Sequence, residues 1–444
     1  MRRKEKPTFE KDVQMQVSNK DYKSNNMLTA LAAYICIFYP LTDLGLRNII
    51  GWTFLLGYWI FNVLSQKGKL YINKKRLSYV WVAIVVIIYF RMPNARRDLR
   101  SMQALIITIM ICALYLLSIK TSQVDIFRMT RIFIIAGIIF SVFLIICRIF
   151  PSLYLNSILP LLKGADAGEI RRLSRLGYGA HIANSLTYGP YIISIASLFC
   201  LGDMLMGTKI FTRRRAIIYE LLFMAAILCE GRRSELVGLL IAAFVVYLIS
   251  TPNSARKVLK RFGAMIAIVL VAVILITILM RHGYLTRFVN TFELLKSGIS
   301  TNDLNKLTSS RYYLWENAWT LFKTNPIFGI GWGSFSNNVV SVVNNVHNCY
   351  LQFLCEIGIV GFLLVVIPML SVFIGSLKEL KNVIYGNNRN SIEGVFLILS
   401  VGMQTYFFIL FALDPVFYKG YFHLLYIMLI VIYDFSYSRN RQMI

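Results

Sequence analysis

The sequence has few acidic residues and few histidines. Its 21 Asp and Glu residues stand against 47 Lys and Arg residues, which gives a formal net charge of +26 at pH 7. Metal centres in proteins are built from clustered histidine, cysteine and carboxylate ligands. The carboxylates here are dispersed, and the four histidines show no ligand spacing: they are His181, His282, His347 and His423. The sequence therefore predicts no metal ion and no other cofactor.

Other signals of function are also missing. The seven cysteines include no Cys-x-x-Cys pair and most lie within apolar runs, so they are typical of small apolar fillers rather than of disulfides. No Gly-x-x-x-x-Gly-Lys-[Ser/Thr] phosphate loop is present, which disfavours ATP-driven export. No internal repeat divides the chain into matched halves, which disfavours a transporter built from inverted repeats. No early apolar core follows the first residues, so the first span itself is expected to direct membrane insertion.

Long apolar runs dominate the rest of the chain. Hydrophobic residues make up 57% of its 444 residues, whereas soluble domains are nearer half apolar. Apolar runs of about 20 residues are long enough to cross a bilayer as helices. The pattern predicts an all-α, polytopic integral membrane protein with about twelve transmembrane helices. The expected spans are 27–44, 48–66, 78–91, 101–118, 129–150, 187–206, 216–229, 236–250, 263–280, 347–377, 392–412 and 421–435.

Basic residues in the connections give the expected orientation. Lys and Arg are retained in cytoplasmic loops, where they face anionic lipid, and this accounts for the net charge without nucleic-acid binding. The expected divisions are cytoplasmic tails at 1–26 and 436–444, a transmembrane domain at 27–435, and large extracytoplasmic loops at 151–186 and 281–346. Only the connection 91–100, which contains four arginines, opposes this arrangement.

One stretch departs from the apolar pattern. Residues 309–361 turn to Arg, Trp, Asn and Gly with one His, before apolar sequence returns at Gly358. Polar groups at membrane depth are costly, so they indicate a functional site. The characteristic residues of the stretch are Arg311, Trp315, Ala318, Pro326, Gly329, Gly331, Gly333, His347, Asn348, Leu351, Glu356, Gly358 and Gly361. This stretch resembles the O-antigen ligase/polymerase superfamily, which includes Wzy-type polymerases and O-antigen ligases.

The resemblance implies the residues of an active site. Family members pair two arginines with a histidine, and the matching positions here are Arg233, Arg311 and His347. The family has a Ser-Arg pair where this chain has Arg232 and Arg233, so both arginines are candidates to face the site. Arg175, followed closely by a glycine, fits a further family arginine loosely. The resemblance implies His347 as the catalytic base and these arginines as ligands of a diphosphate.

The implied donor is an oligosaccharide on a polyprenyl diphosphate, and its chemistry suits these side chains. Arginine is permanently charged and offers a planar donor fork that fits phosphate. Breaking the sugar–phosphate bond develops negative charge on the diphosphate, which two arginines stabilise electrostatically. A neutral histidine is able to remove the proton of the attacking sugar hydroxyl. Without the resemblance, the plainer interpretation is that an arginine at the end of a membrane span extends its side chain to the lipid headgroups.

Aromatic and polar side chains near the motif are candidates for glycan contacts. Trp315, Tyr312 and Asn348 are the expected contacts with sugar. Trp315 also fits a plainer role, as an anchor in the core of the loop or at the membrane interface.

Other residues of the motif are expected to be structural. Glu356 follows His347 by nine residues, so on a regular helix it points to the opposite side. The glycines at 329, 331 and 333 are expected to allow positive φ in a tight turn.

The resemblance implies a glycosyltransferase that makes a surface polysaccharide (capsule, exopolysaccharide or O-antigen), and the dispersed carboxylates and histidines predict that it is metal-independent. It would transfer lipid-linked glycan to a sugar hydroxyl of another lipid-linked repeat unit, at the outer face of the bacterial plasma membrane. The alternative is ligase-type transfer of finished glycan to another acceptor, and a transporter of lipid-linked glycan is a third reading. The expected partners are the lipid-linked oligosaccharide, membrane lipids, and a chain-length regulator and flippase of the same pathway.

Overall fold

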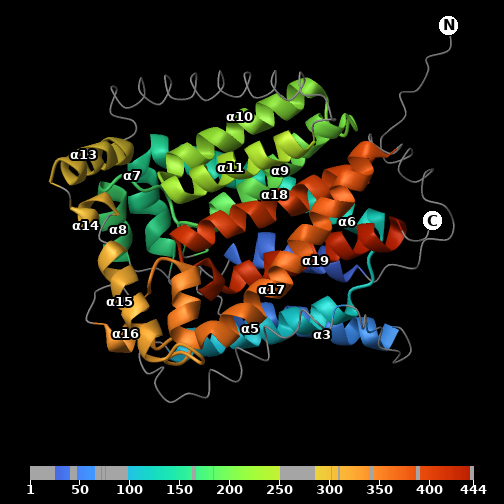
Figure 1. Cartoon of the computed structure of the whole chain (residues 1–444). Helices are drawn as coiled ribbons and strands as arrows, with labels where there is room; N and C mark the ends of the chain where they lie inside the picture. Colours follow the sequence, from blue (N-terminus) through green and yellow to red (C-terminus); the bar gives the residue numbers. More distant parts are fainter. Residues whose placement is uncertain are drawn as a thin grey trace, which may run out of the picture.

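Helices form most of the chain. In this computed structural model the described residues are 26–40, 48–65, 72, 76, 99–162, 167–183, 185–250, 286–301, 303–308, 311–339, 345–386 and 391–440. The elements assigned within these ranges are all helical, which confirms the all-α fold class (Figure 1).

Among the described residues, five helices are long and apolar enough to cross a membrane. They are α6 Gln123–Ile149, α9 Tyr188–Met206, α17 Cys349–Tyr385, α18 Ile392–Leu413 and α19 Gly420–Asn440. The shorter helices of the bundle are α2 Met27–Ala33 with its π-helical extension η1 Tyr34–Phe38, α3 Asn48–Ser65, α5 Leu99–Ser118, α10 Arg213–Glu230 and α11 Arg233–Ile249. The chain is therefore a membrane protein. The expected spans 78–91 and 263–280 lie outside the described residues, so the total of about twelve stays a prediction.

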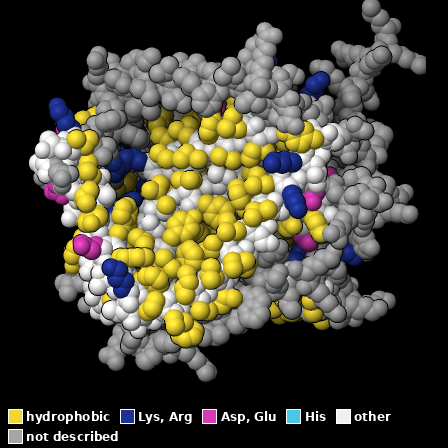
Figure 2. All heavy atoms as spheres, in the orientation of Figure 1, with side chains coloured by type: hydrophobic (Ala, Val, Ile, Leu, Met, Phe, Trp, Pro, Cys, Tyr) yellow, Lys and Arg dark blue, Asp and Glu magenta, His cyan; other side chains and the backbone are white. Residues whose placement is uncertain are grey.

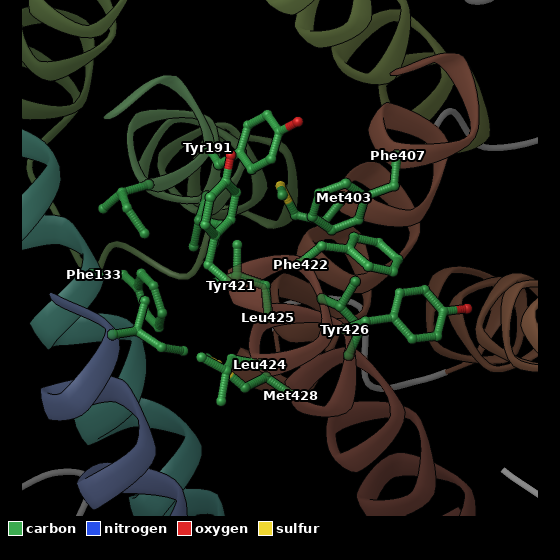
Figure 3. Packing of buried hydrophobic residues seen from close by; sticks show 14 of the residues in the cluster. Phe133, Tyr191, Met403, Phe407, Tyr421, Phe422, Leu424, Leu425, Tyr426 and Met428 are labelled. Carbon is green, nitrogen blue, oxygen red and sulfur yellow. The ribbon is translucent and has the colours of Figure 1, made fainter. Parts of the chain in front are cut away.

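Two helices form the centre of the bundle. Nearly every residue of α9 is buried, and so is most of α18. The neighbouring helices α6, α10, α11, α17 and α19 pack around this pair. Figure 3 shows the packing at their meeting point, where Phe133 of α6 and Tyr191 of α9 face Phe407 of α18 and Phe422 of α19. The core thus holds the ends of these helices in fixed positions relative to one another.

The long apolar helix α6 begins at a polar cap. Ser122 accepts a hydrogen bond from the backbone of Asp125 at 3.2 Å, and the Asp125 carboxylate accepts one from the backbone of Ser122 at 2.9 Å. This capping box starts α6 at Gln123, several residues before the expected span at 129, because the polar first turn hides the helix from a hydropathy pattern.

The short helices gather at one end of the bundle. Both long loops expected from the sequence contribute to this end, on the left of Figure 1. The first loop contains α7 Pro151–Leu153, η4 Tyr154–Ile158, η5 Leu159–Leu161 and α8 Ala167–Arg175. The second contains α13 Thr286–Thr301, α14 Leu304–Leu307, α15 Arg311–Thr324 and α16 Phe335–Asn338.

The sides of the bundle are apolar. Figure 2 shows hydrophobic side chains across most of the described surface between the two ends of the molecule. On α17 the exposed residues include Leu363, Ile367, Leu370 and Ile374, which share one face of the helix. Exposed apolar surface of this extent is what a lipid-facing helix bundle requires.

The helix α17 is interrupted at Gly358. Its φ of 64° lies in the left-handed region, and a Cβ at this position would stand 2.2 Å from the carbonyl oxygen of Ile327. The turn that follows α15 packs into this break: Ile330 and Gly331 donate backbone hydrogen bonds, each of 2.9 Å, to the carbonyls of Cys355 and Glu356. The expected span 347–377 therefore consists of two helical segments that meet at Gly358. The backbone of the turn after α15 packs against this break.

The side chain of Glu356 fastens the same turn. Its carboxylate accepts hydrogen bonds from the backbone of Gly333 at 2.9 Å and of Phe335 at 3.2 Å. Gln352 and the hydroxyl of Tyr418 are further donors to it. The expectation of positive φ is confirmed, since φ is 71°, 105° and 72° at the glycines 329, 331 and 333.

Candidate functional site

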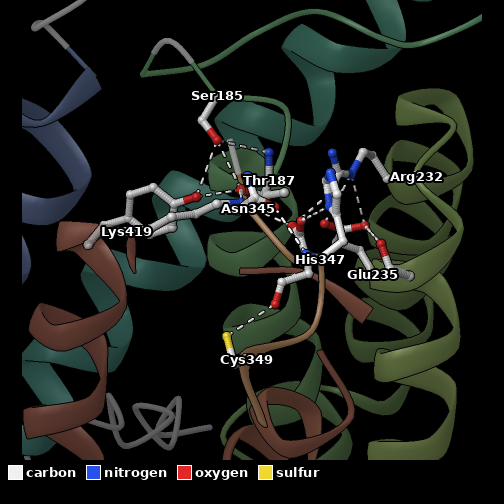
Figure 4. A network of polar contacts seen from close by, with 11 residues as sticks. Ser185, Thr187, Arg232, Glu235, Asn345, His347, Cys349 and Lys419 are labelled. Atoms are coloured by element: carbon white, nitrogen blue, oxygen red, sulfur yellow. Dashed lines mark hydrogen bonds and ion pairs between the residues drawn. The ribbon is translucent and has the colours of Figure 1, made fainter. Parts of the chain in front are cut away.

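The carboxylate of Asp414 contacts Arg232, Lys419 and His347. Figure 4 shows the polar network in which these three partners lie. Asp414 directly follows α18 and is 3% exposed. Its Oδ2 accepts hydrogen bonds from Arg232 at 2.8 Å and from Lys419 at 3.0 Å. Its Oδ1 lies 3.5 Å from Nδ1 of His347. We call Asp414, Arg232, Lys419 and His347 the Asp414 cluster.

Local structure fixes the position of His347. The residue has a φ of 54°, and its backbone N–H donates to the side-chain oxygen of Asn345 at 3.1 Å. The next residue, Asn348, caps α17 by accepting a hydrogen bond from the backbone of Leu351 at 3.1 Å. The imidazole is partly exposed, at 29%. The backbone of His347 is thus fixed by Asn345, and its side chain is partly accessible.

Charge compensation keeps Asp414, Lys419 and Arg232 ionised in spite of burial. Burial disfavours the charged form of Asp414, but Lys419 and Arg232 hold the pKa of this carboxyl well below its usual range. Burial likewise opposes the charge of Lys419, yet Asp414 raises the pKa of its ammonium. Asp414 thus forms a buried ion-pair network with Arg232 and Lys419, and its carboxylate offsets the repulsion between the two cations.

Arg232 bridges two carboxylates within this network. It precedes α11, and its Nε lies 3.2 Å from both carboxylate oxygens of Glu235 in the first turn of that helix. Its Nη2 reaches Asp414. Although burial opposes its charge, Glu235 and Asp414 raise the pKa of Arg232 above its ordinary value. With two carboxylates bound, Arg232 is neutralised by the protein itself.

Arg233 and Arg311 differ from Arg232 in this respect. They begin α11 and α15, and neither forms an ion pair with a described residue. Burial lowers the pKa of both guanidinium groups. The charges of Arg232 and Arg233 lower the pKa of Arg311 further, against the opposing effect of Asp414. The structure thus brings together two cations without neutralising carboxylates, an arrangement that favours an anionic ligand.

The other predicted arginine lies on a separate helix. Arg175 is the last residue of α8 and its side chain is exposed. In the described part of the chain, no ion pair or hydrogen bond connects it with the Asp414 cluster. Its role as a diphosphate ligand stays a prediction.

The predicted glycan contacts have different surroundings. Tyr312 is 37% exposed on α15. Trp315 packs against a small core that includes Leu314 and Ala318, as expected for an anchor of the loop. The side-chain oxygen of Asn348 is occupied in capping α17. Sugar binding by these three residues stays a prediction, and of the three Tyr312 offers the most accessible surface.

Sequence reasoning missed two members of the cluster, Asp414 and Lys419. Both lie in the short connection between the last two expected spans, with the sequence DPVFYKG. An acid and a base close together between two spans are costly near a membrane and are a signal of function. Lys419 also donates to the hydroxyl of Thr187 at 3.0 Å, which ties this connection to the start of α9. Thr187 in turn contacts the hydroxyl of Tyr421.

Comparison with known proteins agrees with the motif. Residues 218–366 match the family model described as O-Antigen ligase. The match includes Arg232, Arg233, Arg311 and His347, whereas Asp414 lies beyond it. No curated protein matches the chain. The resemblance seen in the sequence is confirmed: the match of residues 218–366 to the O-antigen ligase model supports a relation to the O-antigen ligase/polymerase superfamily.

Proposed function

We propose that the protein is a surface-polysaccharide polymerase of the bacterial plasma membrane. It transfers glycan from a polyprenyl diphosphate to a sugar hydroxyl of another lipid-linked repeat unit, on the outer face of the membrane. The observations that carry the proposal are the partly exposed imidazole of His347, 3.5 Å from Asp414, and the arginines Arg233 and Arg311, which have no ion-pair partner among the described residues and of which Arg311 interacts electrostatically with Asp414. An anion-binding pair next to a general base matches a reaction in which a diphosphate leaves and a hydroxyl attacks.

The reaction follows from these positions. The acceptor oxygen attacks the anomeric carbon of the donor glycan, and its proton passes to Nε2 of His347. The bond between that carbon and the phosphate oxygen breaks, and its electron pair stays on the diphosphate. Arg233 and Arg311 stabilise the charge that develops there. Since a diphosphate is a good leaving group, the reaction requires no general acid and no metal ion.

Asp414 supports the base in this scheme. With Oδ2 held by Arg232 and Lys419, Oδ1 remains to accept a hydrogen bond from Nδ1 of His347. That contact selects the tautomer with an unprotonated Nε2 and stabilises the imidazolium once the proton has arrived. The present separation of 3.5 Å is long for a hydrogen bond. Such contacts commonly shorten when substrate binds.

The test is a gel of surface glycan from cells in which His347→Ala replaces the native protein, with lipid-linked intermediates extracted alongside. The proposal predicts that the glycan ladder disappears and that single repeat units accumulate on the lipid. Long glycan that forms but stays on the lipid carrier would instead identify a ligase, the alternative within the same superfamily. A normal ladder from a normally expressed variant would overturn the assignment of His347 and reopen the transporter reading.

A matched control is available in His181. This histidine lies in the loop before α9, and neither ring nitrogen has a hydrogen-bond partner among the described residues. Burial, followed by the charge of Arg232, lowers the pKa of His181 to about 4. It is therefore neutral and enclosed, and His181→Ala is expected to leave the ladder intact.

A further inference from the structure

An apolar turn follows α15 and is exposed. It comprises residues 325–331, with the sequence NPIFGIG, and we call it the 325–331 turn. Its Ile327 is 55% exposed and its Phe328 is 59% exposed. Trp319, near the end of α15, is 44% exposed, and the centre of its ring lies 5.2 Å from that of Phe322. Large apolar side chains gathered on a surface indicate that an apolar phase or a partner covers them.

The exposed turn is continuous with the lipid-facing surface of the bundle. The second segment of α17, which begins after the break, exposes Ile359 at 39%, Leu363 at 43% and Ile367 at 58%. These residues are four positions apart, so they share one face of the helix. The backbone N–H of Ile359 donates a hydrogen bond of 2.9 Å to the carbonyl oxygen of Pro326, the residue before Ile327. The turn therefore lies against the first residues of that face. Figure 2 shows a broad apolar surface where α17 crosses the bundle in Figure 1.

The backbone hydrogen bonds at the break are those that a position within the bilayer requires. The start of a helix leaves N–H groups without intrahelical partners, and lipid offers no water to satisfy them. Besides the bond from Ile359, the turn accepts one of 3.3 Å from the N–H of Val360 at the carbonyl oxygen of Ile327. On the other side of the break, the same turn donates to the carbonyls that end the first segment of α17. The turn thus takes the place of water on both sides of Gly358.

The exposed face of α15 suits the lipid headgroups. Leu314 and Ala318 are buried on one side of this helix. Trp319 and Lys323 are exposed and four positions apart, so they share another side. Tryptophan is favoured at the interface between membrane and water, and a lysine there extends its ammonium to the phosphates. Since α15 packs beside α17 at one end of the bundle, it is placed to lie along that interface (Figure 1).

The turn is rigidly connected to a residue of the candidate site. The helix α15 begins at Arg311 and ends at Thr324, directly before the turn. Its 14 residues form one helix about 20 Å long, so its two ends move together. The diphosphate of a lipid-linked substrate lies at the level of the headgroups, because its hydrocarbon chain is in the bilayer. An anchor at one end of α15 therefore fixes the depth of the arginine at the other.

We propose that the 325–331 turn is a membrane anchor. Ile327 and Phe328 insert among the acyl chains of the leaflet at this end of the bundle, and Trp319 lies at its headgroups. Insertion holds α15, and with it Arg311, at the level of the lipid phosphates. The insertion goes beyond the proposed function, since it requires only that the bundle spans a membrane. Its consequence for Arg311 rests on the proposed function.

The test measures which phase surrounds the turn. The full-length protein, with the half-buried Cys229 replaced by serine and the six buried cysteines retained, receives one nitroxide label and is placed in phosphatidylcholine vesicles. Electron paramagnetic resonance then compares collisions of the label with oxygen, which concentrates among acyl chains, and with a nickel chelate, which stays in water. Phe328→Cys and Ile327→Cys should favour oxygen, as should the lipid-facing control Ile367→Cys. Thr320→Cys, at an exposed polar residue of α15, should favour the nickel chelate.

Two other results would overturn the anchor. Labels on the turn that favour the nickel chelate would place it in water. Labels that neither reagent reaches would show that protein covers it, for instance a second copy of the chain. The two labelled positions are separate variants, so one decides the question if the other fails to fold. The readout requires no catalysis, so it is valid whether or not His347→Ala abolishes the glycan ladder.

A second pair of variants tests the link to Arg311. Ile327→Ser/Phe328→Ser removes two apolar side chains, which should disfavour insertion by at least about tenfold. With a lipid-linked donor in vesicles, the KM of this variant should rise about tenfold, whereas Ile327→Leu/Phe328→Leu should keep the wild-type KM. A serine variant with the wild-type KM would overturn the link between insertion and Arg311, even where His347→Ala abolishes transfer.

Discussion

Oδ1 of Asp414 faces Nδ1 of His347 at 3.5 Å, while two cations hold Oδ2 of the same carboxylate. Oδ2 therefore anchors the carboxylate through its two ion pairs, whereas Oδ1 is left to interact with His347, the proposed base. Because Arg232 and Lys419 come from different parts of the chain, the orientation of His347 depends on how α11 and the connection after α18 pack together.

Replacement of Asp414 tests this arrangement. In Asp414→Asn the side chain no longer neutralises Arg232 and Lys419, and its amide can present an N–H to His347 instead of an acceptor. We expect kcat per folded molecule to fall about 10²–10⁴-fold, as when a histidine base loses its orienting carboxylate. Asp203→Asn is the matched control: Asp203 is also buried, but it accepts hydrogen bonds from the backbone of Ile210 and Phe211 at the far end of α9. It should affect stability without lowering kcat per folded molecule.

The ion pair of Asp414 and Lys419 should lose its contribution to stability only at extremes of pH. The folded-state pKa of Asp414 is lowered below its ordinary 3.8, so its contribution is present above that value and is lost as pH falls through the lowered pKa. The pKa of Lys419 is raised above 10.5, so its contribution is lost only as pH rises through that higher value. The difference in melting temperature between wild type and Asp414→Asn should shrink below about pH 4, as Asp414 becomes protonated. A difference that does not shrink below that pH would contradict this account.

The neighbouring arginines Arg232 and Arg233 should respond differently to removal of charge. Arg232→Gln leaves Glu235 and Asp414 without their shared partner, so it should destabilise the protein by about 3–5 kcal/mol, read as loss of folded protein. Arg233→Gln breaks no ion pair among the described residues. It should fold normally and lower kcat/KM for the lipid-linked donor about 10–100-fold. Equal loss of folded protein in both variants would contradict the assignment of a structural role to Arg232 and a ligand-binding role to Arg233.

The break in α17 should tolerate no side chain. In Gly358→Ala the new Cβ would meet the backbone of Ile327 at 2.2 Å, at a φ of 64° that disfavours alanine. We expect destabilisation of about 2–4 kcal/mol, measured as a fall in melting temperature in detergent. Gly57→Ala in α3 is the control, since nothing lies within 4 Å of its added Cβ, and it should be neutral or slightly stabilising. Similar melting temperatures for the two variants would show that the turn does not depend on this contact.

The sequence alone names the candidate site residues that lie in or match one motif. His347 and Arg311 follow from the stretch 309–361, and Arg233 follows from its match to the same family. The positive φ of the motif glycines was also predictable, because closely spaced glycines beside a proline indicate tight turns.

The rest depends on contacts between distant parts of the chain. Nothing in the sequence pairs Asp414 with Arg232, which precedes it by 182 positions. The interruption at Gly358 was not predictable either, because a single glycine in an apolar run is compatible with a continuous helix and only the backbone of Ile327 explains it. Which of Arg232 and Arg233 is neutralised likewise depends on the packing of α11 against the residues after α18.

The central claim is that His347 removes the proton of the acceptor hydroxyl while Arg233 and Arg311 hold the departing diphosphate. The most direct measurement uses purified protein in phosphatidylcholine vesicles with the lipid-linked repeat unit, and follows released polyprenyl diphosphate and elongated glycan together. Wild type should release one diphosphate for each repeat unit added, and His347→Ala should reduce both products about 10²–10⁴-fold while donor still binds. Elongation by His347→Ala at the wild-type rate would contradict the account.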